Sequence, residues 1–463
     1  MTRGVVTHDE GYILHSAEKI FDGQIPYRDF HFVYTPLSIF LTWISFVIFQ
    51  PSILSSRILM ILIALLSSGL IFKTIMYATK NKLYATIAVL TFVSWGPTHI
   101  NFAWPVMFAI FTAFLFSFLL LKFTDSRKSR YLFLAGIAAF FVFLAKQNFG
   151  IAILIPSAIF FSIKHARSLK YTLPFIYGYL WGIIFFAVYL LATGSFAPFL
   201  YDLYDFTIKR IFINESLTTN FIYKDTLIVM LSRTAFYLLP LALSLAAFIL
   251  LFLRRRFHLL FLPATVAVFY IVGIRPTTDY THLVPLLSLC GIPLALYLRF
   301  NIQSTIRMLI LIFTFTFIFL GFNTALFKGY YRWDTPLTKH NNFSSNPKIN
   351  IFLNDKFYNE FKELQNIADT YTATDDYIFV NSYNPLLYFV MNRKEPTKNN
   401  VLATEIDPQQ YYDEALGNLV AKQIKIVILD HKSLNNLPIK KYIENNYRFD
   451  KTIQDFDIYL RNP

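Results

Sequence analysis

Long apolar runs recur through the first 321 residues, and they restrict the chain to folds that place much of their surface in a lipid bilayer. The chain is 55% hydrophobic and 15% charged, whereas a soluble domain carries about 25% charged residues. Several runs approach the roughly 20 residues that a spanning helix needs. The sequence therefore predicts a polytopic α-helical membrane protein with about ten spans, at residues 57–72, 83–95, 104–121, 131–145, 149–163, 172–192, 227–253, 258–274, 282–298 and 306–321.

The connections between these runs differ in basic charge, and this difference predicts the orientation. Every second connection is rich in lysine and arginine, with fifteen such residues against five in the intervening connections. Because cytoplasmic loops carry the positive excess, the chain after Gly321 is expected outside the cytoplasm. The 17 basic and 17 acidic residues of that region balance, so the net charge of +14 belongs to the membrane part. This distribution indicates a multi-pass protein of the inner (cytoplasmic) membrane and argues against nucleic-acid binding.

The pattern of the sequence after Gly321 predicts a small extracytoplasmic α/β domain. Residues 357–371 and PLLYFVMNR have the pattern of helices, whereas DDYIFVNS, IKIVILD and IYLRNP have the pattern of strands. At the other end of the chain, the run at 36–49 is short for a span and typical of an interfacial or re-entrant helix. The predicted units are an extracytoplasmic loop at 1–35, a juxtamembrane helix at 36–50, a membrane core at 57–321 and the soluble domain at 322–463.

The stretch before the juxtamembrane helix has the pattern of an amphipathic helix. Thr7 and Glu10 have the spacing of a capping box, and Gly23 can end the helix. Apolar residues from Ile13 to Phe21 share one face, so the helix is expected to lie on a membrane surface. Carboxylates in a first turn complement the helix dipole, and this is the alternative to a chemical role for the acidic pair at its start.

The pattern DEGY…GQIPYRDF…VYTP resembles the first extracytoplasmic loop of the GT-C glycosyltransferases, in particular bacterial relatives of the protein O-mannosyltransferases and the lipid A aminoarabinose transferases. Those enzymes carry an acidic motif after their first span, then an amphipathic helix and a short helix that starts near a proline. Here the motif falls on Asp9 and Glu10, and the proline is Pro36. Since the family places a span before this loop, the resemblance predicts an apolar stretch encoded upstream of Met1, or else an inactive partner subunit.

The resemblance implies an inverting transfer of a sugar from a polyprenyl-phosphate donor to a hydroxyl of a lipid, glycan or protein acceptor. Such a reaction needs a carboxylate that takes the acceptor proton, and Asp9 is expected to be this base, with Glu10 supporting it. The residues expected to bind donor or acceptor lie at outer membrane edges and in the opening loop: Lys146, Gln147, Asn148, Arg275, Asp279, His282, Arg28 and Tyr34.

Several of these residues also have a simpler interpretation, and Arg275, Asp279 and His282 can belong to a solvated loop with an interfacial histidine. Lys146 can place its charge at the interface from the end of a span, and Arg28 can pair with Asp29. The sequence has neither a glycine-rich phosphate loop nor a zinc-type cluster, which argues against a nucleotide donor, and no metal or other cofactor is expected. A transporter or flippase of lipid-linked sugars is the alternative function, although the repeated halves typical of transporters are not evident.

Overall fold

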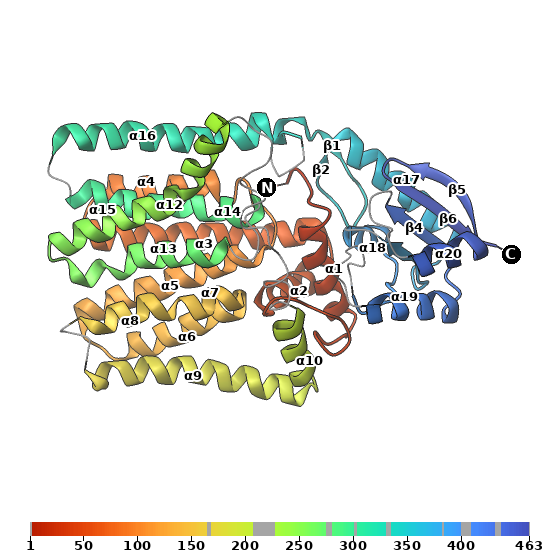
Figure 1. The fold of residues 1–463 in the computed structure, drawn as a ribbon, viewed down its shortest axis with the longest axis horizontal. Coiled ribbons are helices and arrows are strands. Elements are labelled where there is room, and N and C mark those ends of the chain that lie inside the picture. Colours follow the sequence, from red (N-terminus) through yellow and green to blue (C-terminus); the bar gives the residue numbers. More distant parts are fainter. Residues whose placement is uncertain are drawn as a thin grey trace.

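A helical bundle and a smaller α/β unit make up the chain in the computed structural model (Figure 1). The structure describes residues 2–163, 168–206, 227–274, 280–300, 303–329, 335–381, 384–399, 409–430 and 437–462. The bundle helices lie along the long axis of the view, and the strands gather beyond one end of them (Figure 1). Helices α1 (Asp9–Phe21) and α2 (Leu37–Phe49) lie between the bundle and the strands.

The bundle consists of mostly apolar helices. They are α3 (Ile53–Thr79), α4 (Lys82–Trp95), α5 (Pro105–Ser126), α6 (Arg130–Ala145), α7 (Gln147–Ala152), α8 (Leu154–Ser162), α9 (Leu169–Ala192), α12 (Leu227–Leu253), α13 (Phe261–Gly273), α14 (Tyr280–Leu287), α15 (Gly291–Phe300) and α16 (Ser304–Asn323). Among the described residues, five helical segments are long and apolar enough to cross a membrane, and six apolar helical segments are shorter. The predicted count of about ten spans stays a prediction.

The burial of the helices separates a protein-covered interior from an apolar exterior. α5 is buried over most of its apolar stretch, whereas α9 is mostly exposed. The exposed side chains of α9 include Trp181, Ile184 and Phe185. A large exposed apolar surface of this kind is expected where helices face lipid rather than water.

Two glycines bring α6 and α9 into backbone contact, and the helices lie side by side at the lower edge of the view (Figure 1). A Cβ atom at Gly136 would collide with the carbonyl oxygen of Phe175, and a Cβ atom at Gly178 would collide with that of Phe133. Small residues permit such close crossings in membrane bundles. This packing holds α6 in place as far as Ala145, where the candidate site begins.

The capping box predicted from Thr7 and Glu10 is wrong, because the first turn of α1 has a different geometry. His8 is the N-cap residue and makes no side-chain cap bond. Oε2 of Glu10 instead accepts the backbone N–H of Val6 at 3.0 Å. Glu10 takes this position because Arg57 of α3 pairs with it inside the protein.

Both faces of α1 are covered by protein, so the prediction of a helix lying on a membrane surface is also wrong. Its polar face is buried at His15, Glu18 and Lys19, as its apolar face is at Ile13. The segments that cover the polar face come from the C-terminal part of the chain. Periodicity within α1 cannot reveal them.

A four-stranded sheet forms the centre of the C-terminal unit, in the order β3 (Phe379–Asn381), β4 (Ile426–Asp430), β6 (Phe456–Arg461) and β5 (Tyr447–Ile453). β3 and β4 are parallel, whereas β6 is antiparallel to both β4 and β5. In register, Ile428 of β4 pairs with Val380 and with Ile458. Strands lie within the predicted segments DDYIFVNS and IKIVILD, and β6 overlaps the predicted segment IYLRNP but starts two residues earlier. β5 lies outside the predicted strands.

Helices cover both faces of this sheet. α17 (Asp355–Tyr371) and α18 (Leu386–Met391) pack on the face that carries Val380 and Ile428, while α19 (Gln409–Ala421) and α20 (Leu437–Asn446) pack on the face that carries Val427. The predicted helices at 357–371 and 385–393 are confirmed. The first of these cores also contains Leu14 and Ala17 of α1, so the unit is packed directly onto the N-terminal segment.

Candidate active site

Lys146 occupies the break between α6 and α7, at the end of the bundle that faces α1. Its backbone is extended, with φ −158° and ψ 118°, so α6 ends at Ala145 and a new helix starts at Gln147. The side chain is buried, and Nζ lies 5.8 Å from the ring centroid of Tyr34 and 5.3 Å from that of Phe149. Contact with ring faces stabilises a cation that is removed from water.

Two of the predicted residues, Tyr34 and His282, contact Trp104, the residue before α5. The ring centroids of Tyr34 and Trp104 are 5.6 Å apart, and those of Trp104 and His282 are 6.2 Å apart. Because Lys146 lies over Tyr34, the structure brings Lys146, Tyr34 and His282 together from segments far apart in the sequence. Trp104 is not among the residues that the sequence pattern singles out.

Gln147 and Asn148 hold the backbone around this site. Oε1 of Gln147 accepts the N–H of Thr35 at 3.3 Å, and its Nε2 donates to the carbonyl of Val33 at 3.0 Å. Nδ2 of Asn148 donates to the carbonyl of Val272 at 3.0 Å. These amides therefore fix the segment that carries Tyr34 and the end of α13.

Asp9 and Glu10 point into different surroundings. The side chain of Asp9 is 15% exposed, and its Oδ1 lies 3.7 Å from Nε2 of the more exposed His8. α1 links this carboxylate to the aromatic site, because Tyr12 lies one helical turn further on and its ring centroid is 6.4 Å from that of Tyr34. Asp9 is thus the member of the acidic pair that is accessible to a ligand.

Glu10 forms a buried ion pair with Arg57, a residue that the motifs of the sequence do not single out. Nη2 of Arg57 lies 2.7 Å from Oε2 of Glu10 and donates to the carbonyl of Gly4 at 3.0 Å. Burial raises the pKa of the Glu10 carboxyl, and the charge of Arg57 opposes that rise. The available signal was the charge itself, since an arginine inside an apolar run needs a buried partner.

Arg28 does not join this arrangement. Arg28 is exposed and forms a bidentate pair with Asp29, with both nitrogen–oxygen distances at 2.9 Å. Arg275 and Asp279 lie outside the described residues. Within the part of the chain that the structure describes, no group of three or more His, Cys, Asp or Glu side chains is arranged to hold a metal ion.

A polar cluster, defined as His15, Glu18, Lys19, Lys348 and Glu395, joins α1 to the C-terminal unit. Oε2 of Glu395 lies 2.5 Å from Nζ of Lys19 and 3.1 Å from Nε2 of His15. Nδ1 of His15 lies 3.3 Å from Glu18, whose other oxygen lies 2.5 Å from Nζ of Lys348. The cluster borders a cavity of about 880 Å³, lined by charged side chains that include Asp22, Lys394 and Lys422.

The polar cluster shifts the pKa values of two buried groups in opposite directions. Burial disfavours the protonated form of His15, but hydrogen bonds to Glu18 and Glu395 outweigh it and raise the pKa of His15 above 6.5. Burial would raise the pKa of Glu395, but the charge of Lys19 and the hydrogen bond from His15 lower it from 4.5 to about 2. The two groups therefore stabilise the contact most strongly when both are charged.

The polar cluster should make the stability of this contact depend on pH. The contribution of His15 is complete below pH 6.5 and is lost as the pH rises through its raised pKa. The contribution of Glu395 is complete above pH 4.5 and is lost as the pH falls toward 2. We expect the unfolding temperature to fall from pH 6 to pH 9, and His15→Asn to reduce this change. An equal fall in parent and variant would contradict this role.

Comparison with known proteins shows the fold. No protein-family model matches the sequence, and no curated protein sequence matches it. The crystal structure of ArnT from Cupriavidus metallidurans bound to undecaprenyl phosphate is similar at a TM-score of 0.64 and 12% identity, over 100% of this chain and 96% of that chain. The same protein in the apo state gives 0.60 and 13%, with the same coverage.

At sequence identities of 12% and 13%, this structural similarity supports the fold and nothing more. ArnT is a GT-C lipid A aminoarabinose transferase, so the resemblance indicated by residues 9–36 is confirmed at the level of the fold. The full coverage of both chains includes the bundle, the N-terminal segment and the C-terminal unit. The chain is a multi-pass membrane protein with the GT-C fold.

Proposed function

We propose that the chain transfers a sugar from a polyprenyl-phosphate donor to an acceptor hydroxyl at the outer face of the cytoplasmic membrane. The observation that carries the proposal is the buried Lys146 in the helix break beside Tyr34 and Trp104. This cation lies in a fold shared with a protein whose structure contains undecaprenyl phosphate. A buried cation at an outer membrane edge suits a phosphate that remains attached to a lipid chain.

The donor phosphate would be bound by Lys146 and by the indole of Trp104. Nε1 of Trp104 is buried and has no hydrogen-bond partner among the residues that the structure describes. An unsatisfied buried donor costs about 1–3 kcal/mol, and a phosphate oxygen would remove that cost. His282, against the same indole, is placed to contact the sugar or the acceptor.

Asp9 would serve as the general base. The acceptor oxygen forms a bond to the anomeric carbon and gives its proton to Asp9, while the bond from that carbon to the phosphate oxygen breaks. The electron pair leaves with the polyprenyl phosphate, which needs little acid assistance. A carboxylate also balances the positive charge that develops on a sugar ring in such transfers.

Glu10, Gln147 and Asn148 would act as positioning residues. Glu10 accepts the N–H of Val6 and pairs with Arg57, so it fixes the start of α1 and with it Asp9. Gln147 fixes the backbone on both sides of Tyr34. Such support matters because an error of about 1 Å in a reacting group can cost about a hundredfold in rate.

Replacing Lys146 by methionine tests the proposed donor site. The change keeps the volume and removes the charge, so binding of undecaprenyl phosphate should weaken by about tenfold to a hundredfold, the equivalent of one charged hydrogen bond. Trp104→Phe, which removes only the N–H donor, should weaken it less. Native mass spectrometry of the purified protein with undecaprenyl phosphate measures both.

Lys122→Met is the matched control. Lys122 is a partly buried cation near the end of α5, far along this helix from Trp104, which precedes its start. It should leave donor binding unchanged. Undiminished binding by a folded Lys146→Met protein would show that Lys146 only places its charge at the membrane interface.

A further inference from the structure

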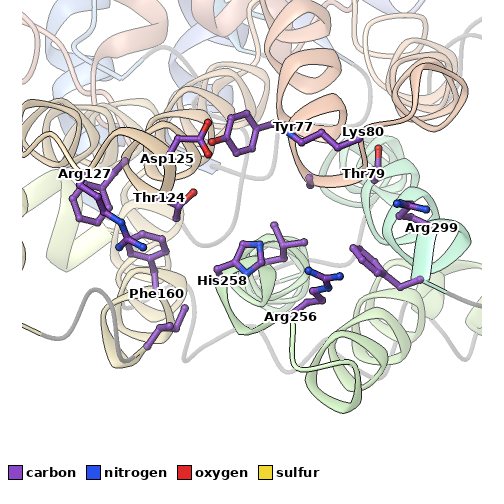
Figure 2. A pocket seen from close by; sticks show the side chains of 15 residues that line it. Tyr77, Thr79, Lys80, Thr124, Asp125, Arg127, Phe160, Arg256, His258 and Arg299 are labelled. Carbon is purple, nitrogen blue, oxygen red and sulfur yellow. The ribbon is translucent and has the colours of Figure 1, made fainter.

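A second cavity lies at the end of the bundle far from the proposed active site. It has a volume of about 400 Å³, and its 15 lining residues come from within the stretches 77–80, 123–127, 160–163, 256–259 and 299–300 (Figure 2). Along α3, twenty residues separate Tyr77 at this cavity from Arg57 beside Glu10, which is about 30 Å at the helical rise of 1.5 Å per residue. The two sites are therefore distinct.

The cavity gathers basic side chains from four connections of the bundle. Lys80, Arg127, Arg256 and Arg299 line it, and Asp125 is the acidic side chain among the lining residues (Figure 2). With His258 neutral, the formal charge of the lining is +3. Like charges held in one concave site repel one another, and a bound anion would remove that repulsion.

Aromatic rings restrict three of these cations. Nζ of Lys80 lies 4.4 Å from the centroid of Tyr77, which Figure 2 shows between Lys80 and Asp125. The guanidinium of Arg127 lies 5.8 Å from the centroid of Phe123, and that of Arg256 lies 5.6 Å from the centroid of Phe300. Stacking reduces the rotamer freedom that these long side chains would lose when they bind a ligand.

The backbone at two of these positions favours glycine, yet each position carries a cation. Lys80 follows α3 and Arg127 follows α5, both with φ +55° in the left-handed region. Glycine is the usual residue at such helix ends because it has no Cβ. A basic side chain is present instead at both helix ends, and both line the same cavity.

We propose that this cavity binds a phosphate group, and that an anionic phospholipid of the cytoplasmic leaflet supplies it. The size fits one headgroup, since ligand pockets start at about 300 Å³. Phe160, Ile163 and Leu259 add an apolar border that suits the acyl part of a lipid. On the predicted orientation these basic connections face the leaflet that carries anionic lipids, and basic pockets between spanning helices bind such headgroups.

The test uses the full-length protein in nanodiscs and in detergent. The parent should retain phosphatidylglycerol in preference to phosphatidylcholine by native mass spectrometry. Arg256→Gln/Arg299→Gln should weaken this retention by about tenfold to thirtyfold, from about 1 kcal/mol per basic residue. The control Lys128→Gln/Arg254→Gln removes two exposed cations at the same end that do not line the cavity, and it should change retention by less than about twofold.

Three outcomes would overturn the proposal. One is equal retention of both lipids by the parent, and another is equal loss in the lining and control variants. The third is that inorganic phosphate alone protects the protein against unfolding as well as phosphatidylglycerol does, with the same dependence on Arg256 and Arg299. That result would make a soluble phosphate the source of the bound group. Undecaprenyl-phosphate binding at Lys146 should be the same in all variants, so this result is separable from the proposed transfer activity.

Discussion

The Asp9→Asn protein is expected to transfer sugar about a hundredfold to ten-thousandfold more slowly than the parent, because asparagine cannot accept a proton from the acceptor. The substitution keeps the shape of a partly exposed side chain, whose contact with His8 is 3.7 Å long. The protein should therefore insert at normal levels and unfold at the same temperature. The measurement is release of polyprenyl phosphate from a polyprenyl-phosphate sugar by purified protein, with a mixture of hydroxyl acceptors.

Asp375→Asn is the matched control, because Asp375 is an exposed aspartate that pairs with Lys394 on the C-terminal unit. It should leave the rate unchanged. Donor binding should also persist in Asp9→Asn, because Lys146 and Trp104 are untouched. A rate near that of the parent in Asp9→Asn would remove Asp9 as the base, and loss of donor binding would indicate a structural role instead.

Local patterns predicted the elements of this protein well. The helix at 357–371 and the buried strand IVILD are both present, because amphipathic period and continuous apolar character are properties of the segment itself. The helix and the strand need no information about what packs against them. Four of the basic connections meet at one cavity, while the orientation that their charge predicts stays a prediction.

The composition of the candidate site could be predicted only in part. Lys146 and His282 were expected at outer membrane edges and Tyr34 in the opening loop. In the structure Lys146 lies over Tyr34, and Trp104 lies against both Tyr34 and His282. The role of Gln147 was not predictable, since its amide serves backbone groups more than a hundred residues earlier. An amide side chain beside a cation has the same sequence pattern whether it binds a ligand or the backbone.

The environment of α1 is the clearest example of what periodicity does not contain. Its polar face suggested water or lipid headgroups, yet Glu395 covers His15 from 380 residues further along the chain. A polar face is compatible with solvent or with a buried set of ion pairs, and only the tertiary partner distinguishes them. The same reasoning applies to Glu10, whose partner Arg57 determines that it is buried while Asp9 remains accessible.

Replacing Arg57 by methionine is expected to destabilise the protein by about 3–5 kcal/mol, because it leaves the Glu10 carboxylate buried without its partner. Both side chains of the pair are essentially inaccessible, and their nitrogen–oxygen distance is 2.7 Å. The loss can be measured as the shift in the unfolding transition of purified protein titrated with denaturing detergent. Transfer activity should fall as well, since the first turn of α1 loses its attachment to α3.

Burial, rather than distance, is the reason for this large effect, and the chain provides the control. Lys356 and Asp455 pair at 2.8 Å but are about half exposed, so Lys356→Met should cost only about 0–1 kcal/mol. The double variant Glu10→Gln/Arg57→Met removes both buried charges and should be less destabilised than the two single changes added together. Additive losses would mean that Arg57 stabilises the fold through packing and through its bond to Gly4. They would also mean that the contribution of Glu10 to stability does not depend on its charge.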